Sequence, residues 1–233
     1  MLLRQELQLP SQMLAQRAPA ATAAPANQRL AVPGASDLVV DANGMVHDRR
    51  IELARSTNLE KGPMPLVHGV IVHQTGAPTA ASTLNSYQVA GANGAHFLID
   101  LDGKISQTAS LLKQTYHVGK LRARCIAEKR CPPAELAVTS PSAVNRLEMG
   151  KAVPDRYPSN RDSIGIELVG AAIEDPNSKG TFIYNPVTAE QNASLRWLVN
   201  SLSQTLNVPM TEVFRHPEVS RKQPTEASTA RWR

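Results

Sequence analysis

Three of the six histidines stand where segments predicted to be core elements end. His73 closes an apolar, β-branched run, His117 lies two residues before Gly119, and His216 follows an amphipathic helix. Strand ends converge on one edge of a sheet, where neutral imidazole nitrogens can gather around a metal ion. A single histidine is more often a structural side chain, so the presence of several at such ends is what favours a metal site.

The strands that carry these residues are indicated by hydrophobic patterning. Residues 66–76, LVHGVIVHQTG, predict a buried central strand ending at His73, and residues 163–170, SIGIELVG, alternate as a second core strand. Residues 95–108, AHFLIDLDGKISQT, predict a hairpin that turns at Asp102-Gly103, a dipeptide that accepts positive φ angles.

Two helices are predicted among these strands. Thr79 can cap a helix that ends before Gly91, and residues 188–207 place apolar side chains on one face behind a capping box of Thr188 and Gln191. Strands interleaved with helices, one hairpin among them, favour a mixed sheet over an all-parallel, doubly wound one. The predicted fold class is therefore α/β (α+β), with a mixed central β-sheet flanked by helices on both faces.

Composition limits the classes of function. The chain has 233 residues, of which 42% are hydrophobic and 19% are charged, and its formal net charge is +5. These values exclude wholesale disorder, and no run approaches the roughly 18 apolar residues of a membrane-spanning helix. The basic residues are scattered and only 4% of residues are aromatic, so neither nucleic acid nor a membrane is an expected partner.

Two segments lie outside the predicted core. Residues 1–36 begin without a recognisable secretory signal and continue as an Ala- and Pro-rich stretch, which predicts a flexible segment before a domain at 37–233. Residues 121–159 are polar and contain prolines, which indicates an insertion in that domain. Cys125 and Cys131 lie in the insertion, and their spacing leaves both free thiols and a local disulfide open.

Five segments in order carry a resemblance to a known family: IVHQTG, AHFLIDLDGKISQ, YHVGK, NRDSIGIELVG and RHPEVSRKQPTEA. Together they resemble the zinc-dependent N-acetylmuramoyl-L-alanine amidases that are related to peptidoglycan recognition proteins. The likeness runs from about Leu66 to Ala227 and is interrupted at residues 121–159. It implies an amidase-like fold, Zn2+ as cofactor, and peptidoglycan or muropeptides as substrate.

The resemblance also implies a set of zinc ligands. His73 matches the first ligand of the family and His216 the second. The third ligand, Asp or Cys in the family, would fall at Pro224, which has no ligating atom. Glu226, ten residues after His216, is the predicted replacement because a carboxylate oxygen suits zinc, and Glu218 or water is the alternative.

Four further residues receive roles from the same resemblance. Glu167, in SIGIELVG, matches the general base, and Lys222 matches a lysine that would stabilise the oxyanion. His117 resembles a histidine of the substrate cleft and is assigned, with Asn160, to substrate binding. The alternative for Glu167 is an anchor of the strand end, and the alternative for Asn160 is a simple turn residue.

The leading function is a peptidoglycan hydrolase that cleaves the amide bond between N-acetylmuramic acid and the L-alanine of the stem peptide. The runner-up is a non-catalytic peptidoglycan-binding module, which the irregular QPTEA segment supports. The substrate of the intact wall lies outside the cytoplasm. The lack of a visible signal and the cysteine pair therefore favour an antibacterial effector, exported by a dedicated machine into a target periplasm and paired with an immunity protein. Action in the cytoplasm on recycled fragments and release by phage lysis are the alternatives.

Overall fold

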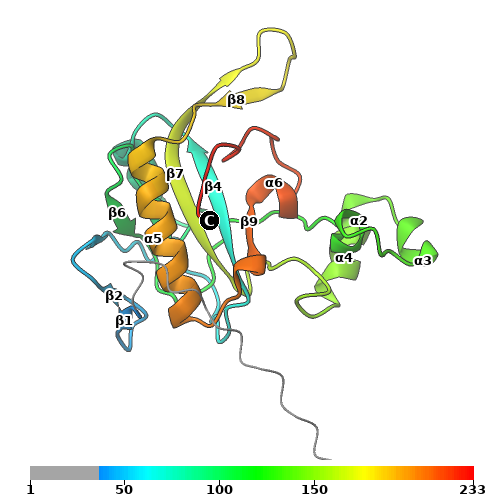
Figure 1. The fold of residues 1–233 in the computed structure, drawn as a ribbon, viewed down its shortest axis with the longest axis horizontal. Coiled ribbons are helices and arrows are strands. Elements are labelled where there is room, and N and C mark those ends of the chain that lie inside the picture. Colours follow the sequence, from blue (N-terminus) through cyan, green and yellow to red (C-terminus); the bar gives the residue numbers. More distant parts are fainter. Residues whose placement is uncertain (1–36) are drawn as a thin grey trace, which may run out of the picture. The chain divides into compact units, whose positions relative to one another are not determined.

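A seven-stranded mixed sheet forms the centre of residues 37–233, the part of the chain that the computed structural model describes (Figure 1). The predicted flexible segment at 1–36 lies outside the described residues. The strands of the sheet are β3 (Ile51–Leu53), β4 (Gly69–Gly76), β5 (Phe97–Ile99), β6 (Ile105–Gln107), β7 (Ser163–Glu174), β8 (Phe182–Tyr184) and β9 (Val213–Arg215). Their order is β3-β6-β5-β7-β4-β9, and β8 pairs with the far part of β7. The pairs β5 with β6 and β7 with β8 are antiparallel, and the other pairs are parallel.

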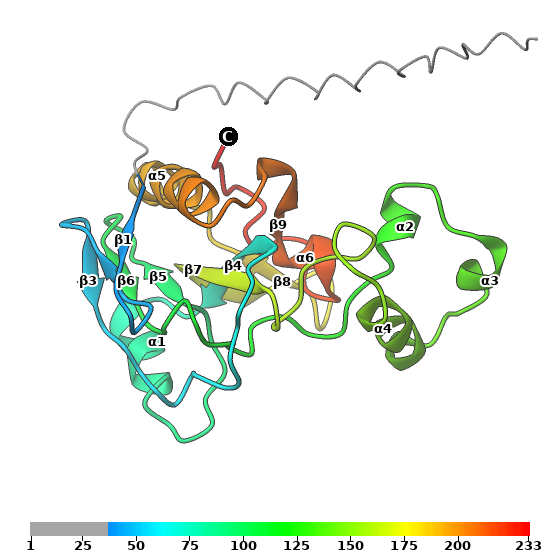
Figure 2. The same cartoon turned by 90° about the horizontal axis from the view of Figure 1, so that it is seen from below.

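Helices cover both faces of this sheet, as Figure 2 shows. Helix α5 (Ala189–Thr205) lies on one face and helix α1 (Ala80–Ser86) on the other. The capping box predicted at the start of α5 is present, and the leucines of its apolar face pack into the main core with β4, β5 and β7. The predicted mixed sheet with helices on both faces is confirmed.

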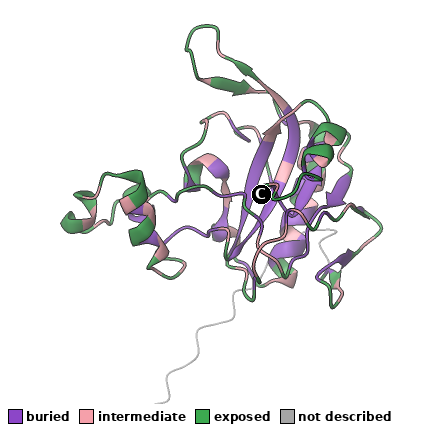
Figure 3. Cartoon of the chain, turned by 180° about the vertical axis from the view of Figure 1, so that it is seen from behind, coloured by how far each residue is buried: buried purple, intermediate pink, exposed green. Residues whose placement is uncertain are grey.

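Strands β4 and β7 both run further than the sequence predicts. The strand predicted to end at His73 continues to Gly76, and the strand predicted to end at Gly170 continues to Glu174. They extend because the two strands pair with each other as far as Gly76 with Ala171, and β7 then pairs with β8. The central strands are buried along most of their length, whereas β8 and the end of β7 are largely exposed (Figure 3).

The predicted hairpin is present between β5 and β6. The backbone N–H of Asp100 donates to the carbonyl of Lys104 at 2.9 Å, and Gly103 has a φ of +85°. A Cβ at Gly103 would lie 2.8 Å from the carbonyl oxygen of Glu190. This position therefore favours glycine both for its backbone conformation and for its close approach to α5.

Residues 121–159 form three short helices, which lie beyond β9 in Figures 1 and 2. Within this segment Cys125 and Cys131 form a disulfide, the second of the two alternatives left open by their spacing. The remaining elements are β1 (Val39–Val40) and β2 (Val46–His47), which form a separate two-stranded sheet, α2 (Arg124–Ala127), α3 (Pro133–Leu136), α4 (Pro141–Met149), η1 (Met210–Glu212) and α6 (His216–Val219).

Buried ion pairs fasten this segment to the sheet. Arg124 binds Glu212 through two hydrogen bonds of 2.7 and 2.8 Å, and Arg156 binds Asp162 at 2.6 Å. We refer to these four residues as the ion-pair cluster. Among residues 37–233, no helix combines the length and the apolar character that crossing a membrane requires.

Candidate active site

His73 and Glu167 lie side by side on the sheet face that points away from α5. Side chains alternate along a strand, and Val72 and Ile166 pack in the core beneath α5, so their successors face the other way. The register pairs His73 of β4 with Glu167 of β7 directly. His73 is the fifth of the eight residues of β4. The prediction that it stands at a strand end was therefore wrong, because the site is built on the face of the sheet and not on its rim.

Two residues from the C-terminal part of the chain meet His73 on this face. His216 begins α6 directly after β9, and Glu226 lies ten residues later in an irregular segment. The Nδ1 atoms of His73 and His216 are 2.8 Å apart, and Oε1 of Glu226 lies 2.9 Å from His216 Nδ1 and 3.6 Å from His73 Nδ1. All three residues are at most 4% exposed. Two imidazole nitrogens and one carboxylate oxygen thus converge on one buried point.

The charge states at this point suit a metal ion. Burial and the neighbouring His216 lower the pKa of His73 to about 4, so its imidazole is neutral at neutral pH. Burial acts to raise the pKa of Glu226, but hydrogen bonds from His216 and His73 outweigh it and lower the pKa to about 2. Neutral imidazole and ionised carboxylate are the forms that bind divalent cations. The donor set therefore fits a metal of the zinc class.

His117 holds the ring of His73 from the side opposite to His216. Its Nδ1 lies 2.9 Å from His73 Nε2, and its Nε2 lies 3.3 Å from the carbonyl oxygen of Ser163. A Cβ at Gly165 would come within 2.8 Å of His117 Nδ1, so the glycine of SIGIEL makes room for this ring. We refer to His73, His117, His216 and Glu226 as the histidine cluster. The substrate-binding role of His117 stays a prediction, while the structure gives both of its ring nitrogens partners inside the protein.

Asn160 shapes the loop that carries His117. Its Oδ1 accepts hydrogen bonds from the backbone N–H groups of His117 and Val118, at 3.0 and 2.6 Å, and its Nδ2 donates to the carbonyl of Val118. The side chain thus bridges two loops that lie far apart in the sequence. A direct contact of Asn160 with substrate stays a prediction, and the contacts above are those of a residue that fixes the backbone.

The carboxylate of Glu167 is the least satisfied polar group of the site. Its Oε2 atom is buried and has no hydrogen-bond partner among the described residues. Burial and the charge of Glu226 raise the pKa of Glu167 to about 8, although the charge of Lys222 acts in the opposite direction. A carboxylate with a pKa near neutrality can both accept and release a proton, which is the property that a general base requires.

The other candidates of the C-terminal segment lie in different surroundings. Lys222 is exposed on the loop between α6 and Glu226, and its charge acts on both His73 and Glu167. Glu218, the alternative third ligand, instead accepts a hydrogen bond from the backbone N–H of Arg215 and caps α6. Of the two candidate glutamates, the geometry places Glu226 beside the histidines.

Residues 62–228 match the family model described as N-acetylmuramoyl-L-alanine amidase. The chain belongs to this family. As a family member it is a peptidoglycan amidase, and the family resemblance found in the sequence is confirmed.

Three solved structures illustrate which known proteins have a similar chain trace. The endolysin amidase LysCS from Clostridium intestinale is 18% identical, with a TM-score of 0.40 over 76% of this chain and 86% of its own. A selenomethionine derivative of AmpD is 18% identical, with a TM-score of 0.48 over 81% and 94%. AmpDh3 from Pseudomonas aeruginosa, in complex with anhydromuramic pentapeptide, is 21% identical, with a TM-score of 0.46 over 70% and 57%. No curated protein sequence matches this amidase.

The sequence reasoning missed one aromatic residue beside the site of this amidase. Tyr184 ends β8, and its Oη would lie 3.9 Å from a Cβ at Gly76, the last residue of β4. Burial and the charges of Glu226 and Glu167 raise the pKa of Tyr184 to about 12, which places the phenol within their electrostatic reach. A tyrosine in a short strand before a helix cap carries no sequence signal of such a position.

A cavity of about 460 Å³ flanks the His117 loop of the amidase. Its lining includes the cations Lys120 and Arg161, the amides of Asn145 and Asn160, and the exposed ring of Tyr116, and it contains no acidic side chain. A larger cavity of about 680 Å³ lies between residues 121–159 and the start of β4, and none of the predicted site residues lines it. Of these two cavities, the smaller one is therefore lined by a predicted site residue, Asn160.

Proposed function

We propose that this amidase uses zinc to cleave the amide bond between N-acetylmuramic acid and the L-alanine of the stem peptide. The observation that carries the proposal is the convergence of His73 Nδ1, His216 Nδ1 and Glu226 Oε1, which all lie within 4.8 Å of one another. Two histidines and one carboxylate are a donor set typical of catalytic zinc. Zinc held there would activate water at neutral pH and polarise the carbonyl of the scissile amide.

The protein residues of the proposed mechanism divide the remaining work. Glu167 accepts a proton from the attacking water and passes it to the nitrogen of the leaving L-alanine, so the products are a carboxylic acid and a free amine. The ammonium of Lys222 stabilises the negative charge that develops on the carbonyl oxygen. His117 keeps the ring of His73 oriented through its hydrogen bond to Nε2.

A cavity near the proposed active site suits one part of the proposed substrate. The cationic cavity beside the His117 loop suits the carboxylates of a stem peptide, because Lys120 and Arg161 line it and no acidic residue does. This supports peptidoglycan or soluble muropeptides as substrates and gives the loop at Asn160 a place at the wall of the substrate site.

Digestion of purified peptidoglycan tests this function. The protein is incubated with the wall alone, with a chelator, and with chelator followed by zinc, and the products are read by mass spectrometry. We expect intact stem peptides to be released, the chelator to abolish release, and zinc to restore it. Release that continues after complete removal of metal would contradict the zinc proposal. Wall binding without any release would favour the alternative, a non-catalytic peptidoglycan-binding module.

We further propose that the amidase acts in an oxidising compartment as an antibacterial effector, with an immunity protein as partner. The disulfide between Cys125 and Cys131 supports this, because such bonds persist in a periplasm and are rare in a reducing cytoplasm. Expression in a Gram-negative host, with and without a periplasmic export signal, tests the idea, and Glu167→Gln is the control. We expect lysis only for the exported, unsubstituted protein, and equal lysis from the cytoplasm would contradict it.

A further inference from the structure

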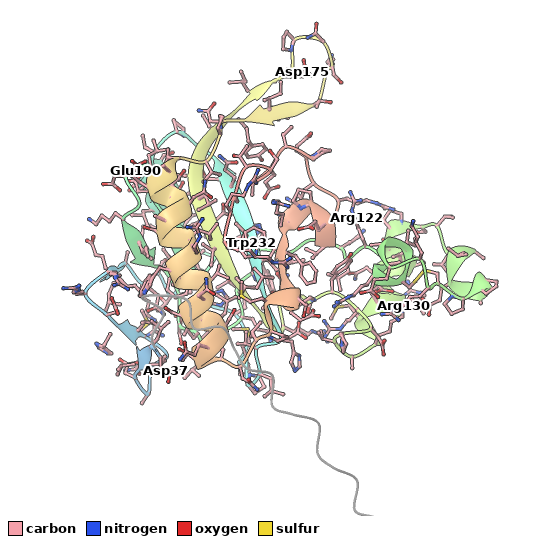
Figure 4. All side chains as sticks on the ribbon, in the orientation of Figure 1. Asp37, Arg122, Arg130, Asp175, Glu190 and Trp232 are labelled. Atoms are coloured by element: carbon pink, nitrogen blue, oxygen red, sulfur yellow. A yellow bond between two sulfur atoms is a disulfide. The ribbon has the colours of Figure 1, made fainter. Side chains whose placement is uncertain are left out.

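The end of β7 and strand β8 form an arm that extends past the rest of the sheet, and we refer to residues 172–184 as the β8 arm (Figure 1). Asp175, near its tip, is labelled in Figure 4. The register of the arm pairs Ala172 with Tyr184 and Glu174 with Phe182. Because side chains alternate along a strand, Phe182 and Tyr184 share one face of the arm and Ile183 lies on the other.

The face that carries Tyr184 and Phe182 continues outward from the active site. Tyr184 lies against the end of β4 at Gly76 and feels the charges of Glu226 and Glu167. Phe182 lies two residues before Tyr184, closer to the tip of the arm, and is 39% exposed. Tyr184 therefore lies on the side of the arm nearer to Glu226 and Glu167, and Phe182 lies further out on the same face.

The outer edge of β8 is closed by the loop that carries the third candidate ligand. The N–H of Phe182 donates to Oε1 of Gln223 at 3.3 Å, and Oγ1 of Thr225 donates to the carbonyl of Phe182 at 2.5 Å. Nε2 of Gln223 also donates to the carbonyl of Gly180 at 2.9 Å. Both backbone groups of Phe182 are therefore unavailable to a peptide that would add to this edge as a further strand. What the arm offers to a ligand is its aromatic face.

We propose that the Tyr184 and Phe182 face of the β8 arm binds the glycan strand of peptidoglycan. A sugar ring presents a face of C–H groups, which stacks on the negative face of an aromatic ring. The stem peptide carries carboxylates, and its matching surface is the cationic cavity of Lys120 and Arg161 on the other flank of the site. The chain has only nine aromatic residues, counted as Trp 2, Tyr 4 and Phe 3, so two on one face beside the site are a local concentration. The inference rests on the proposed function for its substrate.

Binding of peptide-free glycan strands to the full-length protein tests this inference. Calorimetric titration compares the unsubstituted protein with Phe182→Ala, and Ile183→Ala is the matched control, because Ile183 is 41% exposed on the opposite face of the same strand. We expect Phe182→Ala to weaken binding about tenfold and Ile183→Ala to leave it unchanged. Phe182→Trp should retain binding and Phe182→Leu should not, since leucine keeps apolar bulk without a flat ring. Thermal melting confirms that each variant is folded.

Hydrolysis supplies a second readout. In Phe182→Ala, the ratio of kcat/KM for glycan strands bearing peptides to kcat/KM for a single-sugar muramyl peptide should fall about tenfold, through KM. Equal effects of Phe182→Ala and Ile183→Ala, or an unchanged ratio, would overturn the inference. If the unsubstituted protein cleaves nothing but still binds glycan strands through Phe182, the proposed function fails and this inference stands. If it cleaves the wall with no dependence on Phe182, the inference alone fails.

Discussion

This amidase has two clusters of buried polar side chains, the ion-pair cluster and the histidine cluster. They differ in how many of their polar atoms have hydrogen-bond partners. In the ion-pair cluster, each carboxylate meets a guanidinium, and Asp162 also accepts hydrogen bonds from the N–H and Oγ of Ser159. In the histidine cluster, the carboxylate of Glu226 lies close to two imidazoles, those of His73 and His216. Two buried atoms at this site, Glu167 Oε2 and His216 Nε2, have no hydrogen-bond partner among the described residues.

The difference separates a structural site from a chemical one. No side-chain nitrogen or oxygen of the ion-pair cluster is buried without a partner, within the part of the chain that the structure describes. Its charges cancel, so its effect is to fasten residues 121–159 to the sheet. The unsatisfied atoms of the active site are destabilising on their own, and they are retained where a ligand or a proton can use them.

Glu167→Gln should give the largest effect, because it removes the proposed general base and preserves the shape of the side chain. We expect turnover to fall by about 10²- to 10⁴-fold, while the affinity of the proposed metal site for zinc is unchanged. Peptide release measured by mass spectrometry and zinc content measured by elemental analysis check the two parts separately. Full activity of the variant would show that the proton acceptor is another group.

Glu226→Gln should weaken the proposed metal site without disturbing the fold. The variant loses the only charged donor of the histidine cluster, so the Kd for zinc should rise by more than the roughly 100-fold that loss of an outer partner costs. Competition with a chromophoric chelator measures this Kd. Glu218→Gln is the matched control, because Glu218 caps α6 instead of facing the histidines. Equal zinc affinity in both variants would sink the assignment of Glu226.

Asp162→Asn tests the other cluster, where the expected loss is one of stability. Removing the charge that Arg156 and Ser159 bind should lower the free energy of unfolding by about 2 kcal/mol at pH 7, with activity per folded molecule retained. Denaturant titration measures the loss. A variant that unfolds normally but loses activity would show that the two clusters are not independent.

The loss of stability in Asp162→Asn should depend on pH. Burial acts to raise the pKa of Asp162, but hydrogen bonds from Arg156 and Ser159 reverse this and lower it in the folded state. A lowered pKa stabilises the fold fully above the unfolded value near 4, and that stabilisation is lost as the pH falls through the folded value. The gap between unsubstituted protein and variant should therefore close only below about pH 4.

Arg130→Gln should have the smallest effect. It tests whether the burial of an ion pair determines how much stability is lost when the pair is removed. Arg130 pairs with Glu128 and Asp155 near the ion-pair cluster, but its side chain is 45% exposed. Exposed pairs contribute little to stability, so the unfolding midpoint should hardly move, and the shift should be smaller still at high salt. A loss as large as that of Asp162→Asn would contradict the distinction.

The elements with a local sequence pattern could be predicted without the structure. The apolar run before His73, the alternation of SIGIELVG, the capping box of Thr188 and the turn at Gly103 each depend on neighbours a few residues away, and the structure contains all four elements. Alternation also explains why Glu167 faces away from the core, since its neighbours Ile166 and Leu168 are buried under α5.

The contacts that join distant segments could not be predicted from local patterns. The hydrogen bond from His117 to His73 spans 44 residues, and the contact between His73 and His216 spans 143. Glu226 lies in a loop without regular secondary structure. Two other residues of this loop, Gln223 and Thr225, form hydrogen bonds with the β8 arm. Local periodicity carries no information on such pairings, because they depend on the packing of whole elements. The sequence therefore determined which residue types were available to the site, and the fold decided which of their atoms meet.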